Sequence, residues 1–478
     1  MAKLVHDVLL LIFIELKSCP TTLYSCVLVN KMWCDVAVRI LWDSMSNESN
    51  PTVRAEESRE KLYNIVSHFL PNAPNEILQK NNIILPLKRF PRLTYNYMEY
   101  FTNITSIWID DMLNLLIDDD SIYSNCKRKL LELEIYKLIL NKCNNVKDFN
   151  WITDIQLYLC PKSDDFFSKL QSLELNQEFV TSVILLSLPV FCHSVKNLKL
   201  HLYQDCSDLS LFIMMQQNLQ SLYLNFDNED EHYEQYPLLS DAIMKKGFKL
   251  KEITLTPLVA LIKPVFFPSL INIQYLILNN DNGELDEHVN WKVWEYNLRL
   301  ASFPRLQYLE TSYLPSSIET LIIKKSSMNL LEINIRYPLE SQNYPIENMQ
   351  LIKAISMCSN ITSLIMDVDS NNVREIINIL QNCSKLEKLY FTTKIKITPN
   401  GDELLNIMSD VSPAALREFS FGENWNLSLN GLKSFFETWK NKNMFQIKFT
   451  HYNDQLIYSW SENHDKLVEK YRNMKIIK

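Results

Sequence analysis

A short apolar signature recurs along most of the chain and constrains the fold more than any other sequence feature. It has the form apolar-x-x-apolar-x-apolar, and all but one of the intervals between occurrences are 23 to 33 residues long. A repeat of that length holds one strand and one helix, and stacked repeats bury a continuous core. The sequence therefore predicts an α/β solenoid of parallel strands and helices over residues 101–451. The signatures begin at Ile104, Val146, Leu170, Val195, Leu219, Leu250, Ile273, Leu306, Leu330, Ile361, Leu386, Leu416 and Met444.

One interval between signatures is longer than the rest. It separates Ile104 from Val146 and leaves room for an additional helix. The apolar spacing after it and later in the chain predicts helices such as 129–142 and 373–381. A further helix, around 465–473, is predicted for a C-terminal cap or tail at 452–478.

Four of the ten cysteines occupy the same position in their repeats, three residues before the first apolar residue of a signature. A thiol at the corner between helix and strand packs as a small hydrophobic group. Stacked repeats place such thiols along an edge rather than around a point, which disfavours a metal site. The four are Cys143, Cys192, Cys358 and Cys383.

Strand residues that alternate with the core positions point to the opposite face of the sheet. On the predicted strands these residues include aromatic side chains and both signs of charge, which favours a protein or peptide partner over a small ligand. The alternative is an ordinary solvated surface. The candidates for target binding are Trp108, Lys199, His201, Tyr223, Glu310, Arg336, Tyr390 and Lys448.

The first 45 residues are apolar on more than one helical face. Leu9, Ile12, Phe13 and Leu16 follow i, i+3, i+4, i+7 spacing, but the residues between them are apolar too. Pro20 then begins a second helical segment. So short a segment cannot bury all of this surface by itself. It therefore either covers the next domain or binds another protein.

The same segment resembles the F-box. The resemblance rests on Leu4-Val5-x-Asp7-x-Leu9-x-x-Ile12-Phe13-x-x-Leu16, on Leu23-x-x-Cys26-x-Leu28-Val29-Asn30-Lys31-x-Trp33 and on Leu41-Trp42. The family usually has Leu-Pro at the position of Leu4-Val5, and Glu at the position of Asp7. F-box domains are three-helix modules that bind a Skp-type adaptor. The resemblance implies an adaptor-facing and supporting apolar surface made by Leu4, Val5, Ile12, Phe13, Leu16, Leu23, Leu28, Val29 and Trp33.

Taken with the repeats, the whole chain resembles the F-box/leucine-rich-repeat family, in particular fungal-type members with cysteine-containing repeats. The resemblance implies an F-box at 1–45, a helical linker at 46–100 and a leucine-rich-repeat solenoid at 101–451. It also implies a non-catalytic substrate receptor of an SCF-type ubiquitin ligase, in the cytosol or the nucleus. Its partners would be a Skp-type adaptor, a cullin scaffold and an unknown protein target. The alternative is an adaptor-bound scaffold that acts outside a cullin ligase.

Composition excludes several other classes of function. Only five glycines occur, no two within eight residues, so the glycine-rich motifs of nucleotide-binding proteins and hydrolases are absent. A net charge of −8 without a long basic run argues against nucleic acid. No C-x-x-C or H-E-x-x-H motif occurs, and we expect no metal or cofactor. The apolar run at 8–14 is too short to span a membrane.

Overall fold

The computed structural model describes most of the chain. The described residues are 2–46, 56–70, 77–81, 83, 93–117, 124–226, 235–280, 289–336, 344–368, 370–392, 400–421, 425–442, 446–451 and 460–478. They form two compact units. The first comprises Met1–His201 and Leu211–Leu219, and the second comprises Leu202–Ser210 and Gln220–Lys478.

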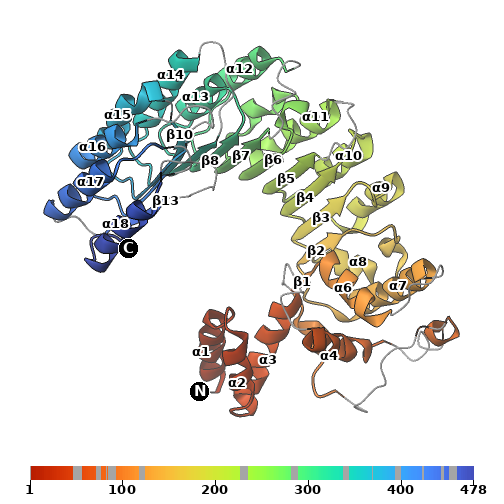
Figure 1. The fold of residues 1–478 in the computed structure, drawn as a ribbon. Helices are drawn as coiled ribbons and strands as arrows, with labels where there is room; N and C mark the ends of the chain where they lie inside the picture. Colours follow the sequence, from red (N-terminus) through yellow and green to blue (C-terminus); the bar gives the residue numbers. More distant parts are fainter. Residues whose placement is uncertain are drawn as a thin grey trace. The chain divides into compact units, whose positions relative to one another are not determined.

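The first unit begins with helices and continues with the first strands of the repeats (Figure 1). Its strands pair in parallel and in sequence order: β1 (Asn103–Ile104), β2 (Asp148–Trp151), β3 (Ser172–Asn176) and β4 (Asn197–Leu202). Its main helices are α1 (Ala2–Glu15), α2 (Pro20–Val27), α3 (Lys31–Ser46), α4 (Glu56–Ser67), η2 (Tyr97–Tyr100), α6 (Ser106–Leu116), α7 (Ser124–Lys142), α8 (Ser163–Phe167) and α9 (Ser182–Phe191). Helix α10 (Ser207–Met215) follows β4.

The second unit holds nine described strands that also pair in parallel and in sequence order. They are β5 (Ser221–Phe226), β6 (Glu252–Thr256), β7 (Tyr275–Asn279), β8 (Tyr308–Ser312), β9 (Glu332–Arg336), β10 (Ser363–Asp367), β11 (Lys388–Thr392), β12 (Glu418–Phe421) and β13 (Lys448–His451). Its helices lie along one side of this sheet (Figure 1). They are α11 (Pro237–Lys246), η4 (Gly247–Lys249), η5 (Val259–Leu261), η6 (Pro264–Ser269), α12 (Trp291–Leu300), α13 (Ser316–Lys325), α14 (Tyr344–Ser356), η8 (Ser370–Glu375), α15 (Ile376–Asn382), α16 (Gly401–Val411), α17 (Leu429–Asn441) and α18 (Glu462–Asn473).

The repeat signature predicted the strands correctly from β2 to β13. In β7 and β8, for example, Leu276, Leu278 and Leu309 are fully buried, while the residues between them belong to the other face of the sheet. The predicted α/β architecture with a long parallel sheet is therefore confirmed. The additional helix in the long interval is also confirmed, because α6 and α7 both lie between β1 and β2.

The first signature was interpreted wrongly. Strand β1 ends at Ile104, and helix α6 begins at Ser106, so Ile107 and Ile109 are helical. The hydroxyl of Thr105 accepts a hydrogen bond from the Trp108 backbone nitrogen at 3.3 Å, which caps the helix. Trp108 is therefore a buried helix residue, 1% exposed, and not an exposed strand residue. Its assignment to the target-binding surface is wrong.

The four cysteines that share a repeat position lie at the ends of helices and are buried, as predicted. Burial raises the pKa of the Cys192 and Cys383 thiols to about 12, and that of Cys358 to about 11. Cys383 donates to the carbonyl oxygen of Cys358, the equivalent residue of the preceding repeat, at 3.5 Å. These thiols therefore stay protonated and stabilise the contact between successive repeats.

Candidate functional site: the N-terminal helices and the strand face

Helices α1, α2 and α3 form a three-helix module with a small core of its own. Phe13 is 1% exposed and Leu23 is 0% exposed, and both pack with Leu9, Val36 and Ile40. The Phe13 and Trp33 rings meet edge to face with centroids 5.3 Å apart. Phe13 and Leu23 are therefore supporting residues of the module, and Leu16 and Trp33 are partly buried against the same core.

Local sequence explains where the helices of the module begin. Pro20 occupies the start of α2, where its fixed φ and missing N–H are compatible with a helix. The side-chain oxygen of Asn30 accepts a hydrogen bond from the Trp33 backbone nitrogen at 3.0 Å and so caps the start of α3. The short connection between the two helices leaves Leu28 and Val29 exposed.

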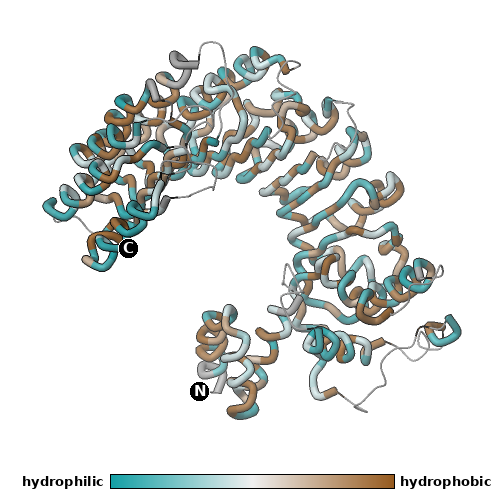
Figure 2. The backbone as a smooth tube through the Cα atoms, viewed as in Figure 1, coloured by the Kyte–Doolittle hydropathy of each residue, from teal (hydrophilic) through white to brown (hydrophobic). Residues whose placement is uncertain are grey.

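The module exposes many large apolar side chains. Apolar residues recur along its backbone (Figure 2). Ile12 is 50% exposed and Leu28 is 71% exposed. Both were predicted from sequence to belong to an apolar binding surface. Leu4 and Val5 lie in α1, but their side chains are outside the described residues. We call the exposed residues the exposed apolar set: Val8, Leu11, Ile12, Ile14, Tyr24, Leu28 and Val29.

Four members of this set, Val8, Leu11, Ile14 and Tyr24, were not among the predicted binding residues. The buried residues of α1 are Leu9 and Phe13, which are four residues apart and pack on α3. The opposite face of α1 carries Val8 and Leu11 next to the charged residues Asp7 and Glu15. Because the sequence of α1 is apolar all round, its helical period did not show which face was buried.

Helix α3 is attached to the segment that leads into the first repeat. Trp42 stacks on Tyr97 with ring centroids 4.4 Å apart. The Tyr95 hydroxyl donates to the Asp35 carboxylate at 2.7 Å, and hydrogen bonds with Cys34 and Asp35 raise the pKa of Tyr95. These contacts bury the base of the module within the first unit and leave the exposed apolar set uncovered by described residues. Residues 47–55, 71–76 and 84–92 of the predicted linker lie outside the described residues.

Each unit has a second candidate site, the side of its strands that is turned away from the helices, which we call the strand face. Among the predicted target-binding residues on it, Arg336 and Lys448 are exposed, whereas Tyr223, Glu310 and Tyr390 are partly buried. In the first unit, Lys199 and His201 lie on the strand face of β4. Seven of the eight predicted residues are therefore on this face, and their binding role stays a prediction.

Several charges on the strand face are neutralised by a neighbouring strand. In the first unit, Glu174 lies 2.9 Å from the Lys199 amine and 2.7 Å from Nε2 of His201. Burial alone would raise the pKa of Glu174, but hydrogen bonds from His201 and Lys199 lower it. In the second unit, Lys448 lies 2.7 Å from Glu418. These pairs resemble the cross-strand ion pairs that stabilise many sheets.

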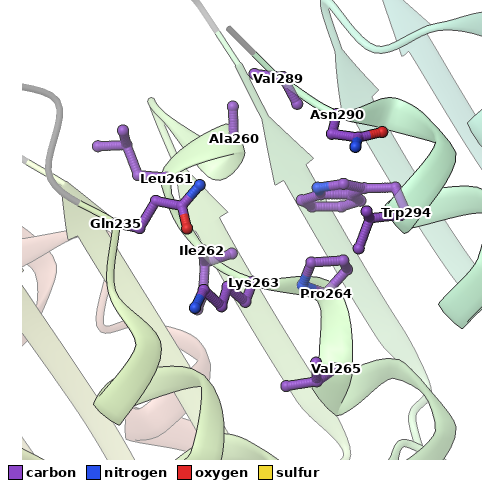
Figure 3. A pocket seen from close by; sticks show the side chains of 11 residues that line it. Gln235, Ala260, Leu261, Ile262, Lys263, Pro264, Val265, Val289, Asn290 and Trp294 are labelled. Atoms are coloured by element: carbon purple, nitrogen blue, oxygen red, sulfur yellow. The ribbon is translucent and has the colours of Figure 1, made fainter.

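A small pocket lies where the connections after β6 and β7 meet the start of α12. Its volume is about 260 Å³, and in Figure 3 the Trp294 indole lies above Pro264, with Lys263 nearby. Sites for small molecules usually occupy about 300 to 1,000 Å³. The pocket therefore suits a single side chain better than a nucleotide or another large cofactor.

Comparison with known proteins finds likeness to solved structures. No protein-family model matches the sequence, and no curated protein is similar to it. A solved structure of the leucine-rich-repeat-containing protein LegL7 from Legionella pneumophila is similar to this chain with 14% sequence identity and a TM-score of 0.34. The match covers 71% of this chain and 94% of that one.

The class of fold follows from the repeats of this chain. Parallel strands in sequence order, helices along one side of the sheet and buried signature residues are consistent with a leucine-rich-repeat solenoid. None of the helices in the described part of the chain is both long enough and apolar enough to cross a membrane.

Proposed function

We propose that this chain is the substrate receptor of an SCF-type cullin-RING ubiquitin ligase. In this proposal the N-terminal module is an F-box that binds a Skp-type adaptor, and the strand face holds the target protein. The chain contributes binding surfaces and no catalytic group or cofactor, and it acts in the cytosol or the nucleus. This assignment rests on the sequence resemblance of the first 45 residues together with the geometry of the module.

The observation that supports the proposal best is the exposed apolar set. A folded module that leaves Ile12, Leu28 and Val29 in water gains free energy when another protein covers them, at roughly 25 cal/mol for each Å² of apolar surface. Clusters of exposed apolar residues of this kind are typical of protein-binding surfaces. Asn30 and the Phe13–Trp33 contact fix the backbone that presents these residues, so little ordering is required on binding.

A receptor of this kind accelerates ubiquitin transfer by holding a target lysine close to the charged conjugating enzyme. The gain comes from effective concentration and requires no catalytic side chain in the receptor. The attachment of α3 to Tyr97 and Tyr95 is consistent with this requirement, because it joins the module to the segment before the first repeat.

The proposal is tested by capture of a purified Skp-type adaptor on the intact chain and on Ile12→Asp and Leu28→Asp variants. Both substitutions place an unpaired charge in the proposed interface, and we expect at least about tenfold weaker binding. Val190→Asp is the matched control, because Val190 is 79% exposed on α9, outside the module. Undiminished adaptor binding by both module variants would contradict the assignment.

A second measurement separates the ligase from a scaffold that binds the adaptor alone. The intact chain and the adaptor are mixed with the cullin scaffold and separated by size. Co-elution of all three proteins supports a ligase receptor. Stable adaptor binding without cullin would instead support a scaffold that acts outside the ligase.

A further inference from the structure

One part of the strand face in the second unit combines tyrosines with carboxylates that form no ion pair with a described lysine or arginine. The strand register places Glu252 beside Tyr275, Tyr275 beside Tyr308, and Tyr308 beside Glu332. Glu310 lies on the same face of β8, two residues after Tyr308. We call these five residues the acidic tyrosine patch.

The two tyrosines form the centre of the patch. Their ring centroids are 6.1 Å apart with an interplanar angle of 36°, and Tyr275 is 43% exposed. The Tyr308 hydroxyl donates to the Glu310 carboxylate at 2.5 Å. Burial and this hydrogen bond raise the pKa of Tyr308 to about 12, so the hydroxyl remains a donor at neutral pH. The pair therefore presents aromatic surface with its orientation fixed.

The carboxylates of the patch differ from the other glutamates of the strand face. Glu174 and Glu418 each pair with a lysine of the next strand. No lysine or arginine in the described part of the chain forms an ion pair with Glu252, Glu310 or Glu332. The guanidinium of Arg336, at the end of β9, instead donates to the side chain of Asn334 at 3.0 Å. The negative charge of the patch is thus not neutralised within the described sheet.

We propose that the acidic tyrosine patch binds a basic, arginine- or lysine-containing segment of the target protein. This inference rests on the proposed function and specifies its partner. An arginine or lysine over an exposed tyrosine gains a cation–π interaction, which strengthens binding about twofold to fivefold. The flanking carboxylates supply the complementary charge, which also accelerates association. Exposed tyrosines are common anchors in protein interfaces.

The spacing of the patch specifies the segment further. Glu252 and Glu332 are three strands apart in register, which is about 14 Å at 4.7 to 4.9 Å per strand. An extended peptide that crosses the strands advances about 3.4 Å per residue. Two basic residues about four positions apart would therefore reach both carboxylates, and each would lie beside one of the two tyrosines.

The test uses a fluorescently labelled, blocked peptide of sequence Ser-Arg-Ser-Ser-Ser-Arg-Ser, with fluorescence anisotropy as the readout on the intact chain. We expect salt-sensitive binding, and roughly tenfold weaker binding by a variant that combines Glu252→Gln, Glu310→Gln and Glu332→Gln. Tyr275→Ala should weaken binding about twofold to fivefold. The matched control combines Glu57→Gln, Glu462→Gln and Glu469→Gln, which change net charge equally at exposed positions outside the strand face.

The single exposed variant Glu332→Gln serves if the triple variant does not fold, and a loss of about twofold to threefold is then expected. Equal binding by the patch variant and the control variant would overturn the inference. So would equal binding of a peptide in which both arginines are replaced by glutamate. Adaptor capture on the same preparations reports the proposed function separately. If the intact chain binds the adaptor but the patch variant and the control variant bind the peptide equally, only the patch is overturned. If the intact chain does not bind the adaptor, the ligase assignment is overturned.

Discussion

In the N-terminal module, Ile12 and Leu28 expose at least half of their surface, whereas Leu276 and Leu309 in the repeats are completely buried. Both regions are rich in leucine and isoleucine, so composition does not account for the difference. Each repeat covers the apolar side of its neighbour, whereas among the described residues α1 packs mainly on α3. The repeats therefore bury their apolar residues against one another, whereas the module leaves apolar surface that the described residues do not cover.

The largest expected effect is the loss of stability caused by a substitution in the core of the repeats. Leu309→Ala removes a fully buried side chain from β8 and should lower the free energy of unfolding by about 2 to 5 kcal/mol. Urea denaturation followed by circular dichroism measures this change. The control is Leu331→Ala, an exposed residue beside β9, which should change stability by no more than about 0.5 kcal/mol. Equal losses in the two variants would contradict the difference in burial.

A second prediction concerns a carboxyl group that the repeats bury completely. Burial raises the pKa of Glu319 from 4.5 to about 8, and its side chain accepts a hydrogen bond from Thr311 at 2.7 Å. Because the folded state holds this proton more tightly than the unfolded state, stability falls as pH rises from about 4.5 to 8. Glu319→Gln keeps an acceptor for the hydrogen bond from Thr311 and removes the carboxyl group that titrates.

We therefore expect Glu319→Gln to be more stable than the unmodified chain by about 1 to 3 kcal/mol at pH 8. The advantage should shrink on acidification toward pH 5. Denaturation midpoints measured across this pH range provide the test. The same pH dependence in both proteins would show that Glu319 is not the group responsible.

A smaller effect is expected at the start of α3. Asn30→Ala removes the cap seen at the Trp33 backbone nitrogen and should lower stability by about 1 kcal/mol. Asn30→Ser retains a capping oxygen and should preserve most of the stability. Hydrogen exchange of the first turn of α3 gives the local readout. Similar exchange in the two variants would mean that the cap contributes little.

The smallest effect on stability is expected for the exposed apolar set. Leu28→Ala should change the free energy of unfolding by no more than about 0.5 kcal/mol, because the side chain is 71% exposed. The same substitution should nevertheless weaken adaptor binding, which separates a binding residue from a core residue. A destabilisation as large as that of Leu309→Ala would show that Leu28 supports the fold instead.

The sequence predicted the repeats well because each strand carries the same buried pattern, and every repeat imposes the same geometry on the next. Prediction failed at Ile107 and Ile109, where i, i+3, i+5 spacing fits a strand. The buried residues Met112 and Leu113 follow Ile109 by three and four residues, which is helical spacing, and Thr105 supplies a helix cap. These two signals could have identified α6 and the burial of Trp108.

The candidate sites were predicted less completely. The motif identified Ile12, Leu28 and Val29, but an apolar helix such as α1 does not show from its sequence which face its neighbours cover. On the strand face, Tyr275 and Tyr308 were missed because they lie immediately before the second apolar residue of their signatures. Only the register of β7 and β8 brings their rings together.

Titration of the intact chain with a purified Skp-type adaptor by calorimetry at several temperatures tests the central claim most directly. If the adaptor covers the exposed apolar set, binding will be one-to-one with a clearly negative heat-capacity change, and Leu28→Asp will abolish it. The absence of binding, or binding with no heat-capacity change and no sensitivity to Leu28→Asp, would contradict the account.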